Sequence, residues 1–317
     1  MLPELIAKAK EGSSFELVAI REMLKIDMSS KQSQIKTSFL TELLEILPTH
    51  FESDSEHIRT CAVELGGFML SQNADSTLSC FMKAFEKKSA IGKTSCLNSI
   101  KFGIGLTKQL PQSLKKYLAT LLNLKQTHVK VARAAVELLQ KITELDSSFI
   151  SKSLFKTLST DIVQHLENRK DLIVEVQMGQ MKMKHDIGRD LRIATCHCIT
   201  KLEECGVFNS TEDVVNSIVK ESERDIRKSA VMELNDVVVA QFDMLGYLLP
   251  RTATGSSHYG GEKGLLNRGL QTHKKLCTGA KNAKVELALR RFLDSIRSAA
   301  AGEAKFIELD AKVTKGD

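Results

Sequence analysis

Apolar residues recur at helical spacing along almost the whole chain. Positions i, i+3, i+4 and i+7 repeat in segment after segment, while the alternation of β-branched residues that is typical of strands is nearly absent. The prolines Pro3, Pro48, Pro111 and Pro250 fall where one helical segment stops or the next one starts. The pattern therefore predicts an all-α protein.

One helical pattern occurs five times. Each copy has an acidic or polar residue, an aliphatic residue, often a basic residue, and then small and apolar residues on one stripe. The copies begin at Ser55, Ala90, His128, Arg189 and Arg224. Aligned on their aliphatic residues (58, 91, 129, 191 and 226), they are spaced by 33, 38, 62 and 35 residues. Three of these steps are close to the roughly 33 to 47 residues of two-helix repeats.

A second amphipathic helix is predicted between the copies, over residues 76–86, 112–124 and 212–219. Because a single helix pair cannot bury its apolar stripe, stacked pairs would share a continuous core. Two helices per period favour HEAT-like repeats over armadillo repeats, which have three. We therefore expect a single HEAT-like solenoid over residues 1–317, wound as the superhelix that is called armadillo-type. A compact helical bundle is the alternative. The recurring Asp190/Arg192 and Asp225/Arg227 suit charged ladders between stacked inner helices.

The longest step, of 62 residues, contains the only strand-like stretch, residues 171–188. Apolar residues there occupy every second position, and their parity switches across Gly179 and Gln180. Glycine suits the first central position of a type II′ turn, because that residue needs φ above zero. The stretch is therefore predicted to be an inserted β-hairpin. The expected cross-strand pairs on its more apolar face are Met178 with Met181, Val176 with Met183, Val174 with His185, and Leu172 with Ile187.

The opposite face of this hairpin is polar. Gln177 would face Lys182, and Glu175 would face Lys184 as an opposite-charge pair. Since an isolated two-stranded hairpin is only marginally stable in water, its Val/Met ridge must be covered. The ridge could lie on the protein's own helices, or it could project as an adaptable apolar edge for a partner.

The composition fits a folded protein that stays inside the cell. The 317 residues are 42% hydrophobic and 26% charged, with 4 Pro and 18 Gly, which excludes disordered and collagen-like classes. No apolar run approaches the roughly 18 residues of a membrane span, and charges follow Met1 too soon for a signal peptide. The 7 scattered cysteines suit a reducing compartment. A net charge of +6 without a dense Lys/Arg cluster is weak evidence for nucleic acid.

The sequence offers no catalytic chemistry. A phosphate loop, a nucleophile elbow and a dinucleotide fingerprint are all absent, so an enzyme is not predicted. Cys196 and Cys198 would point about 200° apart on a helix and could not hold one metal ion, so these thiols, like Cys205, are expected to be buried. Neither a metal nor a cofactor is predicted. Gly66 and Gly67, and Gly103 and Gly105, predict close helix packing.

Residues 172–198, LIVEVQMGQMKMKHDIGRDLRIATCHC, resemble the cullin-associated neddylation-dissociated (CAND) proteins, in their C-terminal HEAT-repeat region. The family pattern reads Leu-Ile-Arg-Glu-Val-Glu-Met-Gly-Pro-Phe-Lys-His, followed by a spaced Asp and Gly before an Asp-aliphatic-Arg helix start, and it aligns without a gap. Differences are Val174 in place of Arg, Gln180 and Met181 in place of Pro-Phe, and Met183 in place of His. The resemblance extends over about residues 128–293. Matching residues are Leu172, Ile173, Glu175, Val176, Met178, Gly179, Lys182, Asp186, Gly188, Asp190 and Arg192.

The resemblance implies a cullin-binding function. In the family this hairpin contacts the N-terminal region of the cullin, where substrate-receptor adaptors also dock, so binding excludes the adaptor. Family members thereby sequester unneddylated cullin-RING ubiquitin ligases and promote receptor exchange, in cytoplasm and nucleus. A RING subunit and a second solenoid chain are further possible partners, because this chain is shorter than the family's solenoids. The residues expected to bind the partner are Val174, Glu175, Val176, Met178, Gly179, Met181, Lys182 and Met183.

Two other functions are compatible with the sequence. A general HEAT scaffold or transport adaptor would use the hairpin only to brace neighbouring repeats, and its ridge would then be fully buried. A DNA-binding repeat protein is a weaker alternative, since charge is little clustered. The Gly/Ser-rich residues 250–264 are expected to form a flexible loop.

Overall fold

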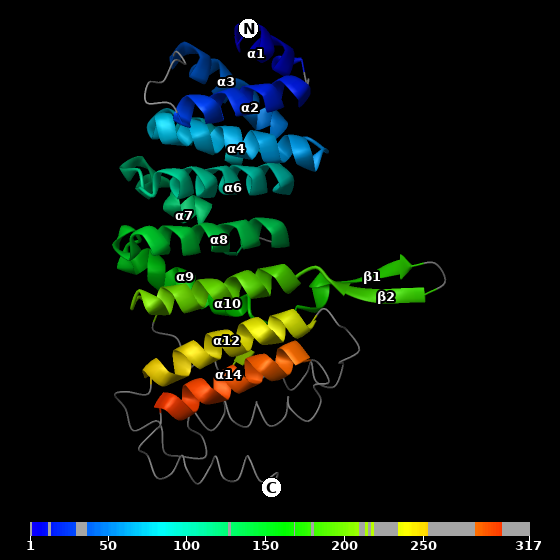
Figure 1. Ribbon diagram of the computed structural model, residues 1–317, viewed down its shortest axis with the longest axis vertical. Coiled ribbons are helices and arrows are strands. Elements are labelled where there is room, and N and C mark those ends of the chain that lie inside the picture. The colour runs from blue at the N-terminus through cyan, green and yellow to red at the C-terminus, as the bar shows by residue number, and fades with distance from the viewer. Residues whose placement is uncertain are drawn as a thin grey trace. The chain divides into compact units, whose positions relative to one another are not determined.

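The described residues of the computed structural model are almost entirely helical, with one β-hairpin (Figure 1). They form two compact units, Met1–Leu154 and Phe155–Asp317. The structure describes residues 2–11, 14–29, 37–125, 128–167, 169–178, 181–208, 213–214, 217–218, 234–252 and 283–299. The prediction of an all-α fold of HEAT-like helical repeats with an inserted hairpin is confirmed. A single solenoid over residues 1–317 stays a prediction.

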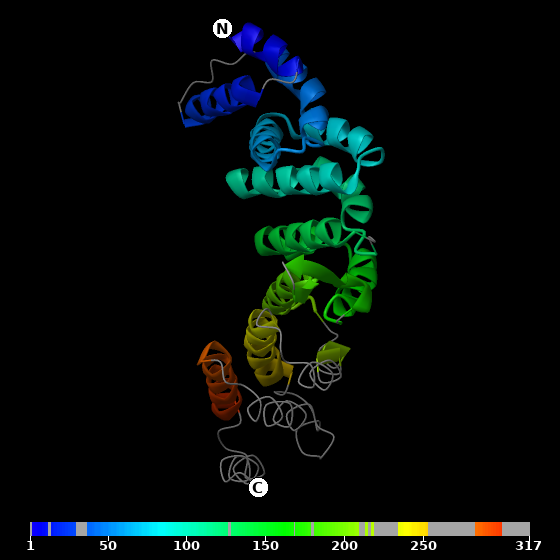
Figure 2. The same ribbon diagram turned by 90° about the vertical axis from the view of Figure 1, so that its right-hand side faces the viewer.

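The first unit is a succession of helical pairs. Its helices are α1 (Leu2–Lys10), α2 (Ser14–Ser29), α3 (Thr37–His50), α4 (Glu56–Gln72), α5 (Ala74–Phe85), α6 (Ala90–Thr107), η1 (Gln112–Tyr117), α7 (Leu118–Leu121), α8 (Val129–Leu145) and η2 (Ser147–Phe149). The long helices α2, α4, α6 and α8 pack each on the next, and α5 packs on α3, α4 and α6 (Figures 1 and 2). This is the stacking of pairs that the repeats predict.

Glycines bring α4 and α6 close together. A Cβ on Gly67 would lie 3.0 Å from the backbone nitrogen of Gly103, and a Cβ on Gly103 would lie 2.9 Å from the carbonyl oxygen of Gly67. Real Cβ atoms do not pack that closely, so both positions require glycine. The close packing predicted for Gly67 and Gly103 is confirmed, whereas the prediction for Gly105 is wrong, because a Cβ there would meet only Lys141 Cε at 3.7 Å. Beside them Phe68 and Phe102 meet edge to face, with ring centroids 5.6 Å apart.

The described residues of the second unit contain the hairpin and three long helices. Its elements are most of α9 (Lys152–Gln164), η3 (Lys170–Leu172), β1 (Ile173–Met178), β2 (Met181–Asp186), α10 (Arg189–Glu204), α12 (Leu234–Thr252) and α14 (Ala283–Ala299). Helix α10 packs on α12, and α12 packs on α14. Phe242 and Phe292 form the core of the last contact, with ring centroids 5.4 Å apart.

Four of the five predicted inner helices are confirmed as α4, α6, α8 and α10. Of the copy beginning at Arg224, residues 224–233 lie outside the described residues, and the remainder forms the start of α12. The predicted second helix at 76–86 is α5. That at 112–124 is instead the 3-10 helix η1 followed by the single turn α7, and that at 212–219 lies mostly outside the described residues.

The predicted loop 250–264 begins too early. Helix α12 continues to Thr252, and the rest of the range lies outside the described residues. The reason is that proline removes one intrahelical hydrogen bond and crowds the carbonyl four residues earlier, which disturbs the helix locally, so the helix ends two residues after Pro250 and not before it. Pro48 lies in the last turn of α3 in the same way. Among the described helices, none is long and apolar enough to cross a membrane.

Candidate partner-binding hairpin

The hairpin has the register that its sequence predicts. Strands β1 and β2 pair antiparallel, with Val174 opposite His185, Val176 opposite Met183, and Met178 opposite Met181. The amide of Ile187 donates to the carbonyl oxygen of Leu172 at 3.0 Å, which continues the pairing past both strand ends. Gly179 and Gln180 lie outside the described residues, so the type II′ turn stays a prediction.

The apolar face changes from buried to exposed along β1. Leu172, at the base, is 6% exposed, Val174 is half-buried, and Val176 is 42% exposed. The side chains of Met178, Met181 and Met183 lie outside the described part of the structure. Figure 1 shows both strands extending away from α10. The described part of the ridge is therefore not fully buried against the protein's own helices, as a purely bracing hairpin would require.

The opposite face is charged and solvated. Glu175, Gln177 and Lys182 are all exposed. Glu175 lies opposite Lys184 in the register, as predicted, and the Lys184 side chain lies outside the described part of the structure. Glu175 Oε2 also lies 3.9 Å from Nζ of Lys182, its diagonal neighbour. Diagonal neighbours on one face are within reach of long side chains. Exposed ion pairs of this kind contribute little stability, so substitutions on this face of the hairpin should leave the fold intact.

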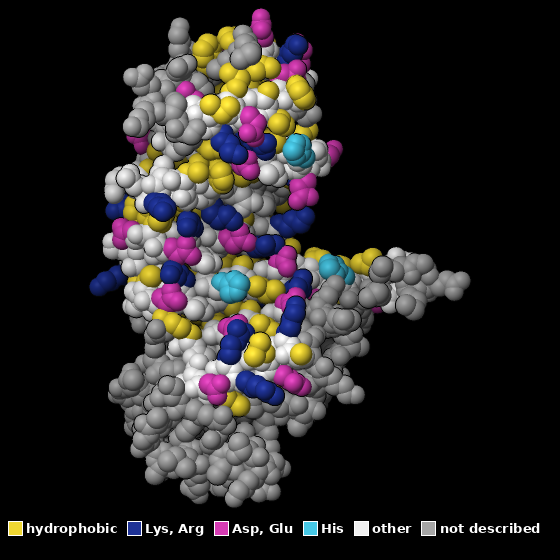
Figure 3. Space-filling model, viewed as in Figure 1, with side chains coloured by type: hydrophobic (Ala, Val, Ile, Leu, Met, Phe, Trp, Pro, Cys, Tyr) yellow, Lys and Arg dark blue, Asp and Glu magenta, His cyan; other side chains and the backbone are white. Residues whose placement is uncertain are grey.

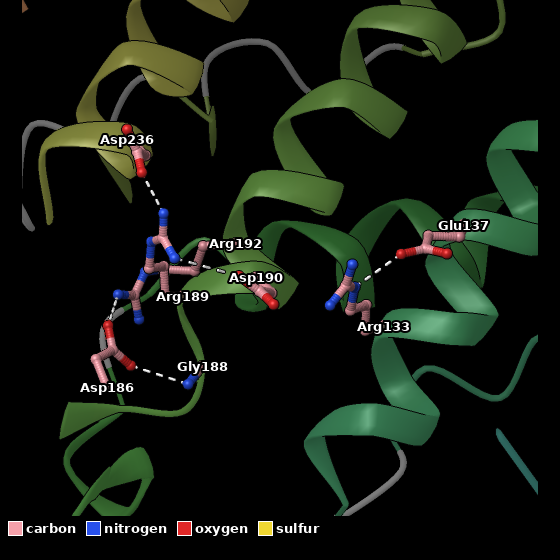
Figure 4. A network of polar contacts seen from close by, with 8 residues as sticks. All are labelled: Arg133, Glu137, Asp186, Gly188, Arg189, Asp190, Arg192 and Asp236. Atoms are coloured by element: carbon pink, nitrogen blue, oxygen red, sulfur yellow. Dashed lines mark hydrogen bonds and ion pairs between the residues drawn. The ribbon is translucent and has the colours of Figure 1, made fainter. Parts of the chain in front are cut away.

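A buried ion pair lies at the base of the hairpin. Asp186, the last residue of β2, is 7% exposed, and its Oδ2 pairs with Nη2 of Arg192, which is 3% exposed and belongs to α10. Its other oxygen, Oδ1, accepts a hydrogen bond of 2.9 Å from the amide of Gly188 (Figure 4). The strand end, the two-residue junction and the first turns of α10 are therefore joined through one carboxylate.

This contact corrects the expected role of Arg192. The sequence suggested a ladder between inner helices, whereas Arg192 reaches back to the hairpin. The reason is that helical side chains lean toward the helix N-terminus, which brings the guanidinium over the junction. The pair that links α10 to α12 is Arg189 Nη2 with Asp236 Oδ2, and Arg189 Nη1 lies 3.7 Å from Asp190 Oδ1. Asp225 and Arg227 lie outside the described residues.

A second, exposed ion pair precedes β1. Arg169 donates from Nε to Asp171 Oδ1 at 3.2 Å and from Nη2 to Oδ2 at 2.5 Å. These hydrogen bonds lower the pKa of Asp171 and raise the pKa of Arg169. Because Asp171 is exposed, the pair offers a matched control for the buried one.

The cysteines of α10 belong to its buried side. Cys196 and Cys198 are fully buried, and burial raises the pKa of Cys196 to about 12. The prediction of buried thiols is confirmed for both, while Cys205 is half-buried. Within the described residues, no group of three or more His, Cys, Asp or Glu side chains could hold a metal ion.

The visible charges of the first unit are mixed in sign. Figure 3 shows Lys and Arg interspersed with Asp and Glu over its described helices on the face drawn. Ion pairs account for part of this pattern, for example Lys101 with Glu137 and Arg133 with Glu137. On that face, the described residues do not form the single-sign basic stripe that is typical of nucleic-acid binding.

Comparison with known proteins agrees with the resemblance seen in the sequence. No family model matches the chain. The Drosophila melanogaster cullin-associated NEDD8-dissociated protein 1 is 27% identical over 185 residues, which are 55% of this chain and 14% of the fly protein. This chain is similar to the CAND proteins. The Mus musculus cullin-associated NEDD8-dissociated protein 2 is 25% identical over 230 residues, 67% of this chain and 18% of the mouse CAND protein, and the Rattus norvegicus protein 2 is also 25% identical.

The resemblance inferred from residues 172–198 is thus confirmed. The matches span 14% of the fly CAND protein and 17–18% of the rodent CAND proteins. The similarity therefore supports the family-level relationship, and it concerns only a part of each relative.

Proposed function

We propose that this chain is a non-enzymatic regulator of cullin-RING ubiquitin ligases that binds unneddylated cullin. The curated relatives are named for association with cullins and dissociation of NEDD8, which supports a cullin-related regulator. The observation that carries the proposal is the hairpin, whose predicted register is present and whose Val176 is 42% exposed. A β-branched side chain exposed on a projecting strand is suited to burial in a partner.

The hairpin supplies specificity at the N-terminal region of the cullin, where the substrate-receptor adaptor docks. Two proteins that need the same surface exclude one another, so the chain sequesters the cullin from the adaptor and promotes receptor exchange. Interface energy concentrates in a few buried anchors, each contributing about 2 kcal/mol or more on truncation. We assign Val176, Met178 and Met181 as these anchors, flanked by Val174, Glu175, Gly179, Lys182 and Met183.

The matched region is 14–18% of the length of the relatives, so we expect this chain to make only part of the contacts that a whole relative makes. The remaining contacts with the cullin would be made by a further part of the same protein or by a second solenoid chain. A RING subunit bound to the cullin would be reached by that part. We place the chain in cytoplasm and nucleus, where these ligases act.

The test compares two neighbouring residues on opposite faces of β1. Val176→Asp puts a charge on the apolar ridge, whereas Gln177→Asp puts the same charge on the polar face, opposite Lys182. Burying an unpaired carboxylate is unfavourable, so Val176→Asp should weaken binding to purified unmodified cullin about 30-fold or more, while Gln177→Asp should change it less than about threefold. Dissociation constants are measured by calorimetry or surface plasmon resonance.

Two further arms examine the competition. Cullin preloaded with adaptor, and cullin carrying NEDD8, should each bind the wild-type chain at least about tenfold more weakly. Wild-type protein that binds unmodified cullin no better than Val176→Asp would refute the proposed function, as would simultaneous binding of adaptor and chain at full occupancy.

A further inference from the structure

Asp186 differs from the other described charges of the hairpin. Glu175 and Lys182 share its face and are exposed, while Asp186 is 7% exposed at the base. A buried carboxylate must be paired and hydrogen-bonded to be tolerated. Here each oxygen has its own partner, since Oδ1 accepts from the Gly188 amide and Oδ2 pairs with Arg192.

These partners tie three consecutive elements together. Gly188 is the N-cap residue of α10, and its carbonyl oxygen accepts a hydrogen bond of 3.1 Å from the amide of Arg192. Only Ile187 and Gly188 separate β2 from α10. Because Asp186 binds both the junction and the helix, rotation of the hairpin about that junction would break at least one contact.

Apolar packing closes the junction from the side of η3, which leads into β1. A Cβ on Gly188 would lie 2.7 Å from Leu172 Cδ1, so Leu172 fills the space beside the glycine. The hydrogen bond from the Ile187 amide to the Leu172 carbonyl oxygen holds both strands together at this level. The base of the hairpin is therefore held by residues that precede β1 and by residues that follow β2.

The first turn of α10 is also fixed to the next helix. Arg189 pairs with Asp236 of α12, one turn from the point where Arg192 pairs with Asp186. Two arginines of one helix end thus connect the hairpin to α10 and α10 to α12. The direction of the hairpin is set relative to the helices of its own unit.

A buried ion pair is a poor choice for stability alone. Two apolar residues of similar volume often stabilise a fold equally well or better, because the charges lose their hydration. What an ion pair adds is direction, since the planar guanidinium and the carboxylate interact strongly only in certain geometries. This pair is therefore suited to orienting the hairpin.

We propose that Asp186 and Arg192 are positioning residues that hold the hairpin in one direction relative to α10, ready to engage the cullin. The inference rests on the proposed function for its consequence in binding. A segment held in its bound direction loses less conformational entropy on association, so the affinity is higher than for a freely swinging hairpin.

The test measures the direction of the hairpin directly. Spin labels on genetically encoded p-acetylphenylalanine at the exposed positions of Lys182 and His197 report the distance between hairpin and α10 by pulsed electron resonance. The variant D186L/R192M keeps the base apolar and should remain folded. Its distance distribution should be at least about twice as wide as that of the wild type, and its cullin affinity about tenfold lower.

A second variant and a control complete the design. Arg192→Lys keeps the charge but loses the planar guanidinium, so it should also widen the distribution. Arg169→Ala removes the exposed ion pair before β1 and should leave both the width and the affinity unchanged. Hydrogen exchange in α10 is measured for D186L/R192M as well. Unchanged protection shows that the helix is still folded, so that a wider distance distribution reports loss of positioning and not a general loss of structure.

The outcomes are distinct for the two proposals. Equal widths in wild type, D186L/R192M and Arg192→Lys overturn the positioning inference, whatever happens to cullin binding. Wide distributions with wild-type affinity overturn its consequence for binding. A wild-type chain that does not bind cullin overturns the proposed function, and the distance distributions still decide whether the pair orients the hairpin.

Discussion

The contact between α4 and α6 and the junction between β2 and α10 hold neighbouring elements together by different means. The first is a backbone approach at Gly67 and Gly103, flanked by the aromatic pair Phe68 and Phe102. The second depends on the buried, charged side chains Asp186 and Arg192. One contact uses shape and apolar area, and the other uses directional polar interactions.

The difference follows from what each contact must define. A helix in a stack is covered by its neighbours, so burial of apolar area, which has no preferred direction, is enough to hold it. In the hairpin, which extends away from α10, the described side chains of Glu175, Val176 and Lys182 are exposed. The direction of the hairpin must come from interactions with defined geometry at the base.

The largest expected effect is on the polar junction. Arg192→Met leaves Asp186 as an unpaired buried carboxylate, which should destabilise the second unit by about 3 to 5 kcal/mol. The measurement is native-state hydrogen exchange, followed separately in peptides from α10 and from α4.

D186L/R192M provides the control, because it removes both charges and should recover most of that loss. If Arg192→Met is as stable as wild type, the buried ion pair does not hold the junction, and the contrast with the apolar contact of α4 and α6 is wrong.

The next effect concerns the close approach of α4 and α6. Gly103→Ala places a Cβ 2.9 Å from the Gly67 carbonyl oxygen and should destabilise the first unit by about 1 to 3 kcal/mol. Gly105→Ala, in the same helix, meets only Lys141 Cε at 3.7 Å and should stabilise the unit by about 0.5 to 1 kcal/mol, because alanine is the better helix former. Urea unfolding of both variants, with exchange in α6 peptides, measures the difference, and effects of the same sign would argue against close packing as the reason for the glycines.

Much of the hairpin could be predicted from the sequence. A period of two, a change of parity and a glycine at the turn leave one register that places Val174 and Val176 on the same face. The inner helices were equally predictable from the repeated stripe, because repeats present the same pattern several times. The exposure of Val176 could not be predicted from the sequence, since the burial of a side chain depends on which elements lie beside it.

The buried base was missed for a related reason. Asp186, Gly188 and Arg192 matched the CAND pattern, but nothing in their spacing says that Asp186 is buried or that Arg192 turns back toward it. The 3-10 helix η1 in place of a regular helix was also unexpected, since the apolar spacing from Gln112 fits either helix type over one or two turns. Local pattern predicts elements, while their junctions depend on tertiary contacts.

The smallest expected effect lies on the contact between α6 and α8, which combines both kinds of interaction. Burial raises the pKa of Glu137, but hydrogen bonds from Lys101 of α6 and from Arg133 outweigh burial, so its pKa is lowered from the ordinary 4.5. A carboxylate with a lowered pKa in the folded state contributes stability above its unfolded pKa, and the contribution disappears as the pH falls through the folded value. Glu137→Gln should therefore cost about 1 kcal/mol at pH 7 and progressively less below the ordinary pKa. Glu144→Gln, whose partner Lys141 belongs to the same helix, should change stability much less. Urea unfolding at neutral and acidic pH measures both, and a Glu137→Gln variant with the same pH dependence as wild type would show that this contact, like that of α4 with α6, relies on shape alone.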